Sequence, residues 1–147
     1  MRSVLGIIGG LVAGVVAIIL VGMVGVGATF SPPAGLDPKD TRQVLEALGA
    51  APVSTHLALM VAWFAGGLVG AWVGKLIART GFAAWTVAAL IAAYVLANVL
   101  VLPLPGWMQA LWIAAPLLGG LVGNHLVRDQ AAEIATEETA DPAPPEA

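Results

Sequence analysis

Gly9-Gly10-Leu11-Val12 is the first of three copies of the same four residues, and the other two copies stand at 66–69 and 119–122. Each copy lies inside a long apolar run. Helices in lipid gain little by burying leucine against leucine, so their association depends on close backbone approach, which small residues four positions apart permit. The repeat therefore predicts closely packed membrane helices, and it points to no reaction.

The composition is typical of an integral membrane protein. Of the 147 residues, 59% are hydrophobic and 10% are charged, and the mean hydropathy is +0.93. In soluble domains about a quarter of the residues are charged. The net charge of −3 combines a mildly basic body, residues 1–128, with an acidic tail at 129–147. The chain has no cysteine, which excludes disulfides, thiol redox relays and thiolate metal sites.

Four apolar segments are long enough to cross a hydrocarbon core of about 30 Å as helices. They span about residues 4–28, 55–77, 82–102 and 107–127. Barrel strands are a poor alternative, because they alternate apolar and polar residues over only about ten positions. We therefore expect an all-α membrane protein, a four-transmembrane-helix bundle that occupies residues 1–128.

Basic residues predict the orientation of this bundle. If the chain crosses the membrane four times, one side receives Arg2, Lys75, Arg79 and Arg128. Basic residues in short loops mark the cytoplasmic side. Lys39 and Arg42 fall on the other side, in the longest loop, residues 29–54. We expect a multi-pass protein of a bacterial inner membrane with both termini in the cytoplasm.

The first apolar run also has features of a signal peptide. Arg2 precedes it, and Val26-Gly27-Ala28 has the small-residue pattern of a signal-peptidase site. The run is about 25 residues long, however, whereas the apolar region of a signal peptide has about 7 to 15. A retained first helix is therefore favoured over cleavage, which would leave three helices.

The loop at 29–54 predicts a short amphipathic helix on the outer side. Asp37 is a typical N-cap residue, Pro38 suits the first helical position, and Gly49 is a typical helix end. We expect a helix over 38–48 with an apolar face formed by Val44, Leu45 and Leu48. Such a helix lies on the membrane surface or caps the mouth of the bundle. A connector that shields its apolar stripe is favoured over a lid or a partner-docking site.

The same loop carries a family resemblance. Pro32-Pro33-Ala34-Gly35-Leu36-Asp37, followed by a short helical segment and a second span rich in Gly-Gly, resembles a group of small uncharacterised four-span bacterial membrane proteins with a Pro-Pro-x-Gly-x-Asp outer loop. The resemblance covers residues 1–127 and leaves out the acidic tail. It implies the four-span architecture and the membrane location, and it implies no biochemical activity.

Small residues recur at every fourth position in each span and predict one close-packing face per helix. These faces are Gly6, Gly10 and Gly14; Ala62, Gly66, Gly70 and Gly74; Ala89, Ala93 and Ala97; and Ala115, Gly119 and Gly123. Four such faces in four spans favour a compact bundle over four independent anchors. All three Gly-Gly-Leu-Val copies fall in the middle or the inner half of the bilayer, where we expect the tightest packing.

Polar and aromatic residues gather in the outer half. Tyr94 and Asn98 share one face of the third span, and Pro116 leaves the carbonyl of Trp112 without its usual helical N–H donor. We expect the Asn98 amide to approach that carbonyl, directly or through water. A candidate cavity, open to the outside beneath the loop helix and close to His56, is lined by Trp63, Tyr94, Asn98, Gln109, Trp112 and Pro116. The favoured alternative is that the polar groups stabilise helix contacts and the rings fill volume.

The sequence lacks the residues that most membrane chemistry requires. Ionisable side chains near mid-bilayer mark transport, proton relay and catalysis, and the spans contain none there. Lys75 is near enough to the inner end of its span to snorkel to the interface. His56 and His125 begin and end spans at opposite faces, too far apart to share a haem iron. With no nucleophile–base pair, phosphate loop, metal-ligand cluster or nucleic-acid face, we expect no enzymatic activity, cofactor, metal or nucleic acid partner.

These observations favour a structural, assembly or accessory subunit, whose partners are the lipid bilayer and either another membrane protein or further copies of itself. The alternative is a small oligomeric channel or carrier for a neutral or weakly charged solute. The tail at 129–147 predicts an acidic cytoplasmic segment, helical at most to Glu138 and disordered beyond it.

Overall fold

The computed structural model describes residues 1–101 and 105–127, and within them every regular element is a helix. In chain order these elements are α1 (Arg2–Thr29), α2 (Thr41–Gly49), α3 (Val53–Ala78), α4 (Gly81–Val99) and α5 (Gly106–His125). In this part of the chain α1, α3, α4 and α5 are long and apolar enough to cross a membrane. Four membrane-competent helices were expected, with ends within about three residues of those observed. The predicted acidic tail lies outside the described residues.

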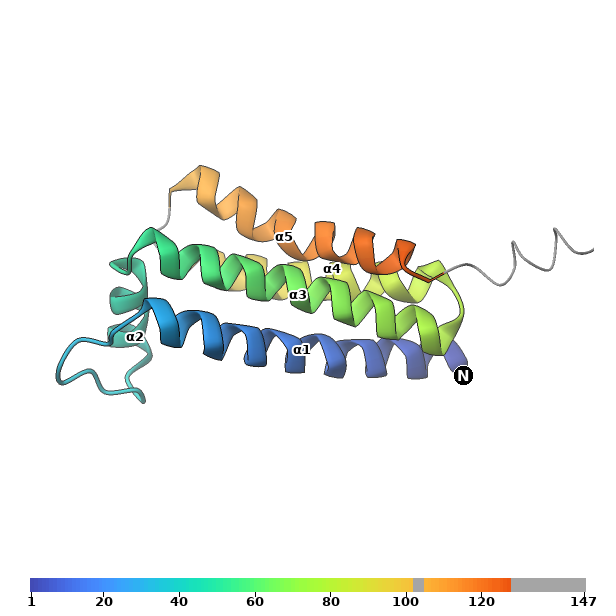
Figure 1. Cartoon of the computed structure of the whole chain (residues 1–147), viewed down its shortest axis with the longest axis horizontal. Coiled ribbons are helices and arrows are strands. Elements are labelled where there is room, and N and C mark those ends of the chain that lie inside the picture. Colours follow the sequence, from blue (N-terminus) through green and yellow to red (C-terminus); the bar gives the residue numbers. More distant parts are fainter. Residues whose placement is uncertain (102–104, 128–147) are drawn as a thin grey trace, which may run out of the picture.

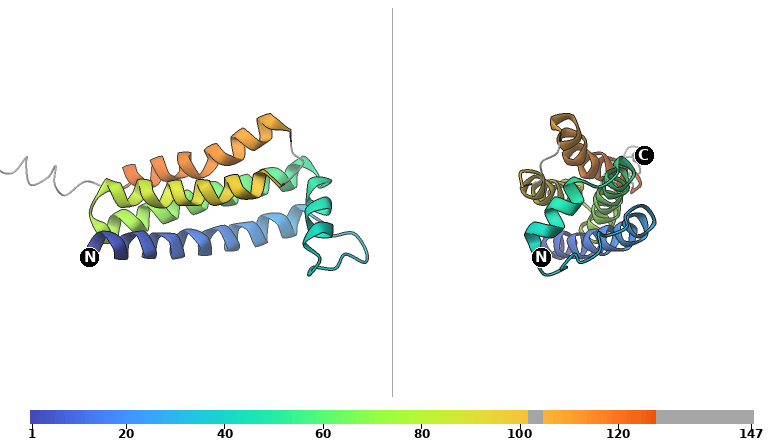
Figure 2. Two further views of the ribbon diagram at one scale, coloured as in Figure 1. Left: turned by 180° about the vertical axis from the view of Figure 1, so that it is seen from behind. Right: turned by 90° about the vertical axis from the view of Figure 1, so that its left-hand side faces the viewer.

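The four long helices run side by side, and α2 lies across one end of the bundle (Figure 1). The N-terminus and the last turn of α5 are at the opposite end. Helix α3 packs against α1, α4 and α5, and α4 also packs against α1 and α5. The view along the bundle places α1 and α5 on opposite sides of α3 (Figure 2). Helix α3 is therefore the centre of the fold.

Glycine brings the backbones of α1 and α3 together. The buried residues of α1 are Gly6, Gly10 and Gly14. A Cβ atom built on Gly10 would lie 2.6 Å from the carbonyl oxygen of Gly70, and one on Gly14 would lie 2.9 Å from that of Gly66. Contacts as short as these leave no room for a side chain at either position. The remaining residues of α1, mostly large and apolar, are half-buried or exposed.

A second set of glycines lies between α3 and α5. A Cβ atom on Gly119 would overlap the carbonyl oxygen of Phe64, and one on Gly123 would overlap that of Leu68. In the reverse direction, a Cβ atom on Gly67 would overlap the carbonyl of Pro116. Two faces of α3 are thus in backbone contact with two different helices. The ribbon of α5 diverges from α3 toward the α2 end (Figure 1).

The small-residue face predicted for the third span is wrong. Its three alanines, Ala89, Ala93 and Ala97, are exposed. The buried face of α4 instead carries Ala83, Ala84, Val87, Ala88, Ile91, Ala92, Val95 and Val99. The reason lies in volume: Cβ atoms built on Gly10 and Gly70 would both meet Val87, so this valine fills space that the glycines leave. Helix α4 packs with branched side chains where its neighbours pack with glycine.

Helix α3 ends where its backbone turns left-handed. Arg79 has a φ of 58° and caps the helix with its N–H bonded to the carbonyl oxygen of Lys75 at 2.7 Å. Glycine is the residue usually found in this conformation at a helix end. The turn is short, because α4 begins at Gly81.

Replacing Gly119 by alanine tests the contact between α3 and α5. We expect Gly119→Ala to lower the free energy of unfolding by about 1–3 kcal/mol, because the added methyl group meets the Phe64 backbone. Titration of the purified protein with SDS in mild detergent, followed by circular dichroism, measures this change.

Gly27→Ala is the matched control, since nothing lies within 4 Å of a Cβ atom at that helical position. Higher helix propensity predicts an unchanged stability or a gain of up to about 1 kcal/mol. Equal effects of the two substitutions would contradict the role assigned to Gly119.

Candidate functional site

The α2 end of the bundle is filled by large side chains instead of glycine. Its buried cluster consists of Val95 and Val99 from α4 and Met108 and Trp112 from α5. Five partly buried apolar residues pack on this cluster, two from α2 and three from α3: Leu45, Leu48, Leu59, Met60 and Trp63. Helix α2 therefore covers the end of the bundle with its apolar face.

Helix α2 begins later than predicted. Asp37-Pro38-Lys39-Asp40 forms a turn, closed by a 3.0 Å bond from the N–H of Asp40 to the carbonyl oxygen of Asp37. Aspartate and proline are favoured at the first two positions of such a turn. The N-cap is Asp40, not Asp37, and its Oδ1 accepts from the N–H groups of Arg42 and Gln43 at 3.0 and 3.4 Å. The helix therefore starts at Thr41, and it ends at Gly49.

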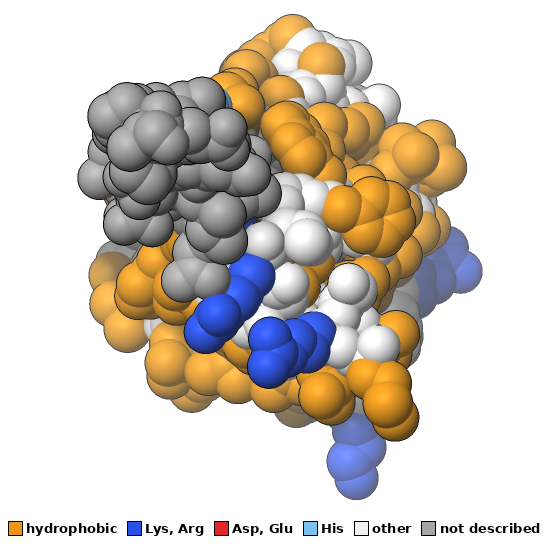
Figure 3. All heavy atoms as spheres, turned by 90° about the vertical axis from the view of Figure 1, so that its right-hand side faces the viewer, with side chains coloured by type: hydrophobic (Ala, Val, Ile, Leu, Met, Phe, Trp, Pro, Cys, Tyr) orange, Lys and Arg blue, Asp and Glu red, His pale blue; other side chains and the backbone are white. Residues whose placement is uncertain are grey.

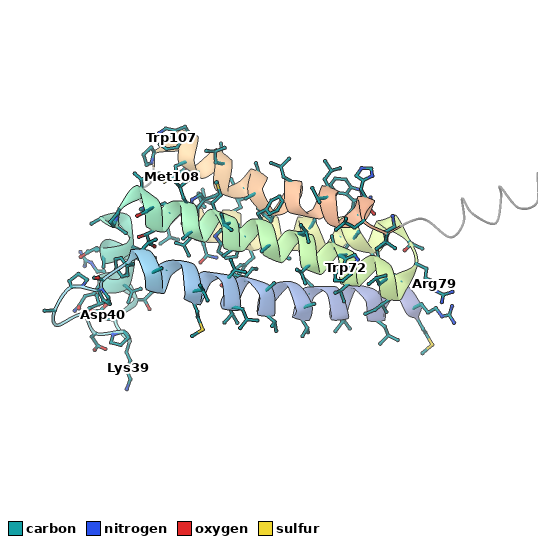
Figure 4. All side chains as sticks on the ribbon, in the orientation of Figure 1. Lys39, Asp40, Trp72, Arg79, Trp107 and Met108 are labelled. Atoms are coloured by element: carbon teal, nitrogen blue, oxygen red, sulfur yellow. The ribbon has the colours of Figure 1, made fainter. Side chains whose placement is uncertain are left out.

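The two faces of α2 differ in character. Arg42 and Glu46 form an exposed ion pair at 3.1 Å on the face turned away from the bundle. Leu45 and Leu48 lie on the other face, against the buried cluster, and Val44 beside them is half-buried. Figure 4 shows Lys39 and Asp40 beyond this end of the bundle, with Trp107 and Met108 at the start of α5 on the same end.

A cavity of about 140 Å³ lies beneath α2. Its wall combines residues of four helices: Leu45, Leu48, His56, Leu59, Trp63, Asn98 and Trp112. Three predicted site residues, Trp63, Asn98 and Trp112, are thus brought together. We call this space the end cavity.

His56 is the most deeply buried polar residue of this wall, with 6% of its surface exposed. Its Nδ1 lies 3.1 Å from the carbonyl oxygen of Pro52, one turn earlier. Because a carbonyl cannot donate, Nδ1 carries the proton, and in the neutral ring Nε2 is then an acceptor. The ring also packs against Trp112, with centroids 5.9 Å apart.

Asn98 does not bond directly to the carbonyl of Trp112. Its Nδ2 donates to the carbonyl oxygen of Tyr94 at 2.7 Å, four residues earlier on the same helix. That oxygen is within reach whatever the spacing between α4 and α5. Asn98 is nevertheless one of the residues in the wall of the end cavity.

The indole N–H of Trp63 is buried and has no hydrogen-bond acceptor among the described residues. A buried donor without an acceptor costs about 1–3 kcal/mol. The ring lies 5.9 Å from that of Tyr94, centroid to centroid. The ring of Trp63 thus belongs to the wall of the end cavity, while its N–H is enclosed by protein atoms.

The other predicted cavity residues lie elsewhere. Tyr94 is 61% exposed and belongs with Trp63 to a second, apolar cavity of about 570 Å³ between α1, α3 and α4. Pro116 is buried against Gly67 and is not in the wall of the end cavity. Gln109 is half-buried and is not in that wall either.

Sequence reasoning missed Leu59 and placed His56 only near the cavity. The signal was present, because His56, Leu59 and Trp63 are spaced three and four residues apart and so share one helix face. Leu45 and Leu48 were assigned to the apolar face of the loop helix, but their contact with the buried cluster depends on where α2 lies.

The opposite end of the bundle is basic. Arg2 and Arg79 are exposed there, and Figure 3 shows basic side chains on this face. Lys75 does not snorkel outward as predicted: it is 3% exposed, and its Nζ donates to the carbonyl oxygen of Asn124 at 2.8 Å. The last turn of α5 provides such acceptors because its carbonyls have no helical partner.

Comparison with known proteins adds no relative: no family model, curated protein or solved structure matches the chain. In the described part of the chain, no group of three or more histidine, cysteine, aspartate or glutamate residues is placed to hold a metal ion. The site is therefore interpreted from its own geometry.

Removing the N-cap of α2 tests how the end cavity is covered. We expect Asp40→Ala to destabilise α2 by about 1 kcal/mol, which corresponds to about five-fold faster amide exchange over 43–49. Hydrogen exchange read by mass spectrometry measures this rate.

Asp40→Asn is the matched variant, because asparagine caps helices as well as aspartate does. It should leave exchange in α2 close to that of the original protein. Faster exchange in both variants would mean that the carboxylate charge, not the cap, holds α2.

Proposed function

We propose that this chain is a four-span, non-enzymatic protein of a bacterial inner membrane that serves as a structural, assembly or accessory subunit. The observation that carries the proposal is the way the bundle is filled. Glycines bring the backbones of α1 and α5 into direct contact with the backbone of α3. Within a single chain, these contacts leave little room for a solute to pass between the helices. A body filled in this way suits a protein that holds or positions a partner.

The positions of the buried polar side chains support the same role. Among the described residues, Thr55 and His56 are buried at the α2 end and Lys75 at the opposite end. Thr55 donates to the carbonyl oxygen of Thr29 at 3.1 Å, which joins the start of α3 to the end of α1. Proton relays and ion pathways use ionisable groups near mid-bilayer. The described helices bury their polar groups at the ends, where they serve to join helices.

The distribution of charge supports an orientation with both termini in the cytoplasm. The end that carries the N-terminus and the end of α5 exposes Arg2 and Arg79. The α2 end carries acidic residues alongside its two basic ones. Because arginine and lysine in short loops mark the cytoplasmic side, we place α2 outside. The Pro-Pro-x-Gly-x-Asp loop, residues 32–37, then faces outward, as the resemblance to small four-span bacterial proteins implies.

Single cysteines test this orientation, because the natural chain has none. We expect Ser31→Cys to react with a membrane-impermeant maleimide in intact spheroplasts. Thr80→Cys, in the turn between α3 and α4, should react only after the membrane is permeabilised. Labelling of Thr80→Cys in intact spheroplasts would reverse the proposed topology.

Purification of the tagged full chain under mild detergent tests the accessory role. We expect a defined membrane protein partner to copurify in fixed ratio and to dissociate when the detergent is made harsher. The same preparation in liposomes should give no solute flux above that of empty liposomes. Flux that Asn98→Ala or Tyr94→Phe alters would replace this proposal with an oligomeric channel or carrier.

A further inference from the structure

We propose that the first half of α5, residues 106–115, is a hinged arm that moves toward and away from α3 about Pro116. Three features of the described residues carry the proposal. A proline lies inside α5, glycine contacts fix the helix only on one side of that proline, and an apolar space separates the other side from α3. The proposal goes beyond the accessory role and does not depend on it. We call residues 106–115 the arm.

Pro116 weakens α5 at its middle. It lies inside the helix, and its ring nitrogen has no hydrogen to donate to the carbonyl oxygen of Trp112, four residues earlier. Proline is a common cause of a sharp bend in a helix. The two halves of α5 are therefore joined at a point that lacks one of the bonds that hold a helix straight.

The half of α5 that follows Pro116 is fixed against α3. Cβ atoms built on Gly119 and Gly123 would overlap backbone carbonyl oxygens of α3, and the carbonyl of Pro116 itself lies against Gly67. Backbones packed this closely leave no room for one helix to shift toward the other. The bend is therefore anchored, and movement is confined to the arm.

The arm, in contrast, is separated from α3 by an open space. An apolar cavity of about 230 Å³, which we call the side cavity, lies between the two helices. Its wall combines residues of α3 with residues of α5: Met60, Val61, Phe64, Leu111, Ala114, Ala115 and Leu118. The ribbon of α5 diverges from α3 toward the α2 end (Figure 1). The arm thus has room to move toward α3.

The membrane gives little preference to either position of the arm. When the arm stands away from α3, lipid chains can enter the side cavity, whose wall is apolar. When the arm closes, Leu111 and Ala114 meet side chains of α3 instead. Lipid chains solvate apolar side chains about as well as other apolar side chains do. Closure therefore exchanges one set of contacts for a similar set, and both positions are populated.

Movement of the arm reaches the end cavity. Trp112 lies in the arm and belongs with Val95 and Val99 of α4 to the buried cluster. It also forms part of the end-cavity wall, together with Leu45 and Leu48 of α2. Bending at Pro116 displaces this part of the wall, so the position of the arm is coupled to the packing beneath α2.

Double electron–electron resonance of spin-labelled cysteine pairs in lipid nanodiscs tests the hinge, because the natural chain has no cysteine. Met23→Cys with Ala110→Cys reports on the arm, and Leu5→Cys with Leu121→Cys is the control pair for the other half of α5. All four positions are exposed. Because α1 and α5 lie on opposite sides of α3 (Figure 2), closure of the arm shortens the first distance.

The expected shift follows from the geometry of a helix. Residue 110 is about 9 Å from the hinge, so a bend of about 20° moves it by about 3 Å. We expect the arm pair to give two distances separated by about 3 Å, or a distribution widened by that amount. The control pair should give one narrow distribution.

Two variants of α5 decide whether the hinge is responsible. Pro116→Ala restores an N–H donor for the carbonyl of Trp112 and should reduce the arm pair to one narrow distribution, with the control pair unchanged. Ala114→Phe fills the side cavity and should remove the shorter distance, which keeps the test decisive if Pro116→Ala fails to fold. Ala89→Phe, on the exposed face of α4, is its matched control and should leave both distances in place.

Four results would overturn the proposal. The first is an arm distribution as narrow as that of the control pair, and the second is an arm distribution that Pro116→Ala leaves unchanged. The third is a shorter distance that persists in Ala114→Phe. The fourth is an equal effect of the two phenylalanine variants.

Discussion

The fold depends on the backbone of one helix being approached from two sides. Helix α3 presents Gly66 and Gly70 to α1 and Gly67 to α5, and the partner helices meet it with glycines of their own. In lipid this contact is the main way to gain packing energy, because apolar side chains are equally well solvated by lipid chains. Helix α4 then fills the remaining space with Val87 and Ile91, and α5 diverges toward the end where Trp112 takes the place of glycine.

This arrangement separates the bundle into two regions of different character. Where α5 carries Gly119 and Gly123, its contacts with α3 are made by backbone and leave little space between the two helices. Where it carries Trp112, its contacts are made by large side chains from α3 and α4. The end cavity lies in this second region, and Trp112 is part of its wall. Helix α2 lines it with only two leucines, so this region is covered by a short helix with a small apolar contact.

The sequence was sufficient for the four long helices, because uncharged apolar runs of this length seldom form anything except a membrane-spanning helix. It was also sufficient for the buried glycines of α1, α3 and α5, because glycine inside a helix is costly unless close packing requires it. The sequence was insufficient to predict the buried face of α4. Alanine occurs on every face of this helix, so residue size alone does not show that Ala88 is buried and Ala89 exposed. The start of α2 was ambiguous because Asp37 and Asp40 both cap well. The estimated depth in the membrane was enough to predict that Trp63, Asn98 and Trp112 are neighbours. The hydrogen-bond partner of the Asn98 amide could not be predicted, because it depends on the distance between α4 and α5.

The lengths of the helices have a consequence for the surrounding lipid. Helix α1 has 28 residues and α4 has 19, which at 1.5 Å per residue correspond to about 42 and 28 Å. Both belong to one closely packed bundle and cannot tilt independently to match a single hydrocarbon thickness. The bilayer must therefore be thicker beside α1 than beside α4, or α1 must extend beyond it, and either adjustment costs a fraction of a kcal/mol per Å. The bundle thus presents two different hydrophobic lengths to the surrounding lipid, a longer one beside α1 and a shorter one beside α4.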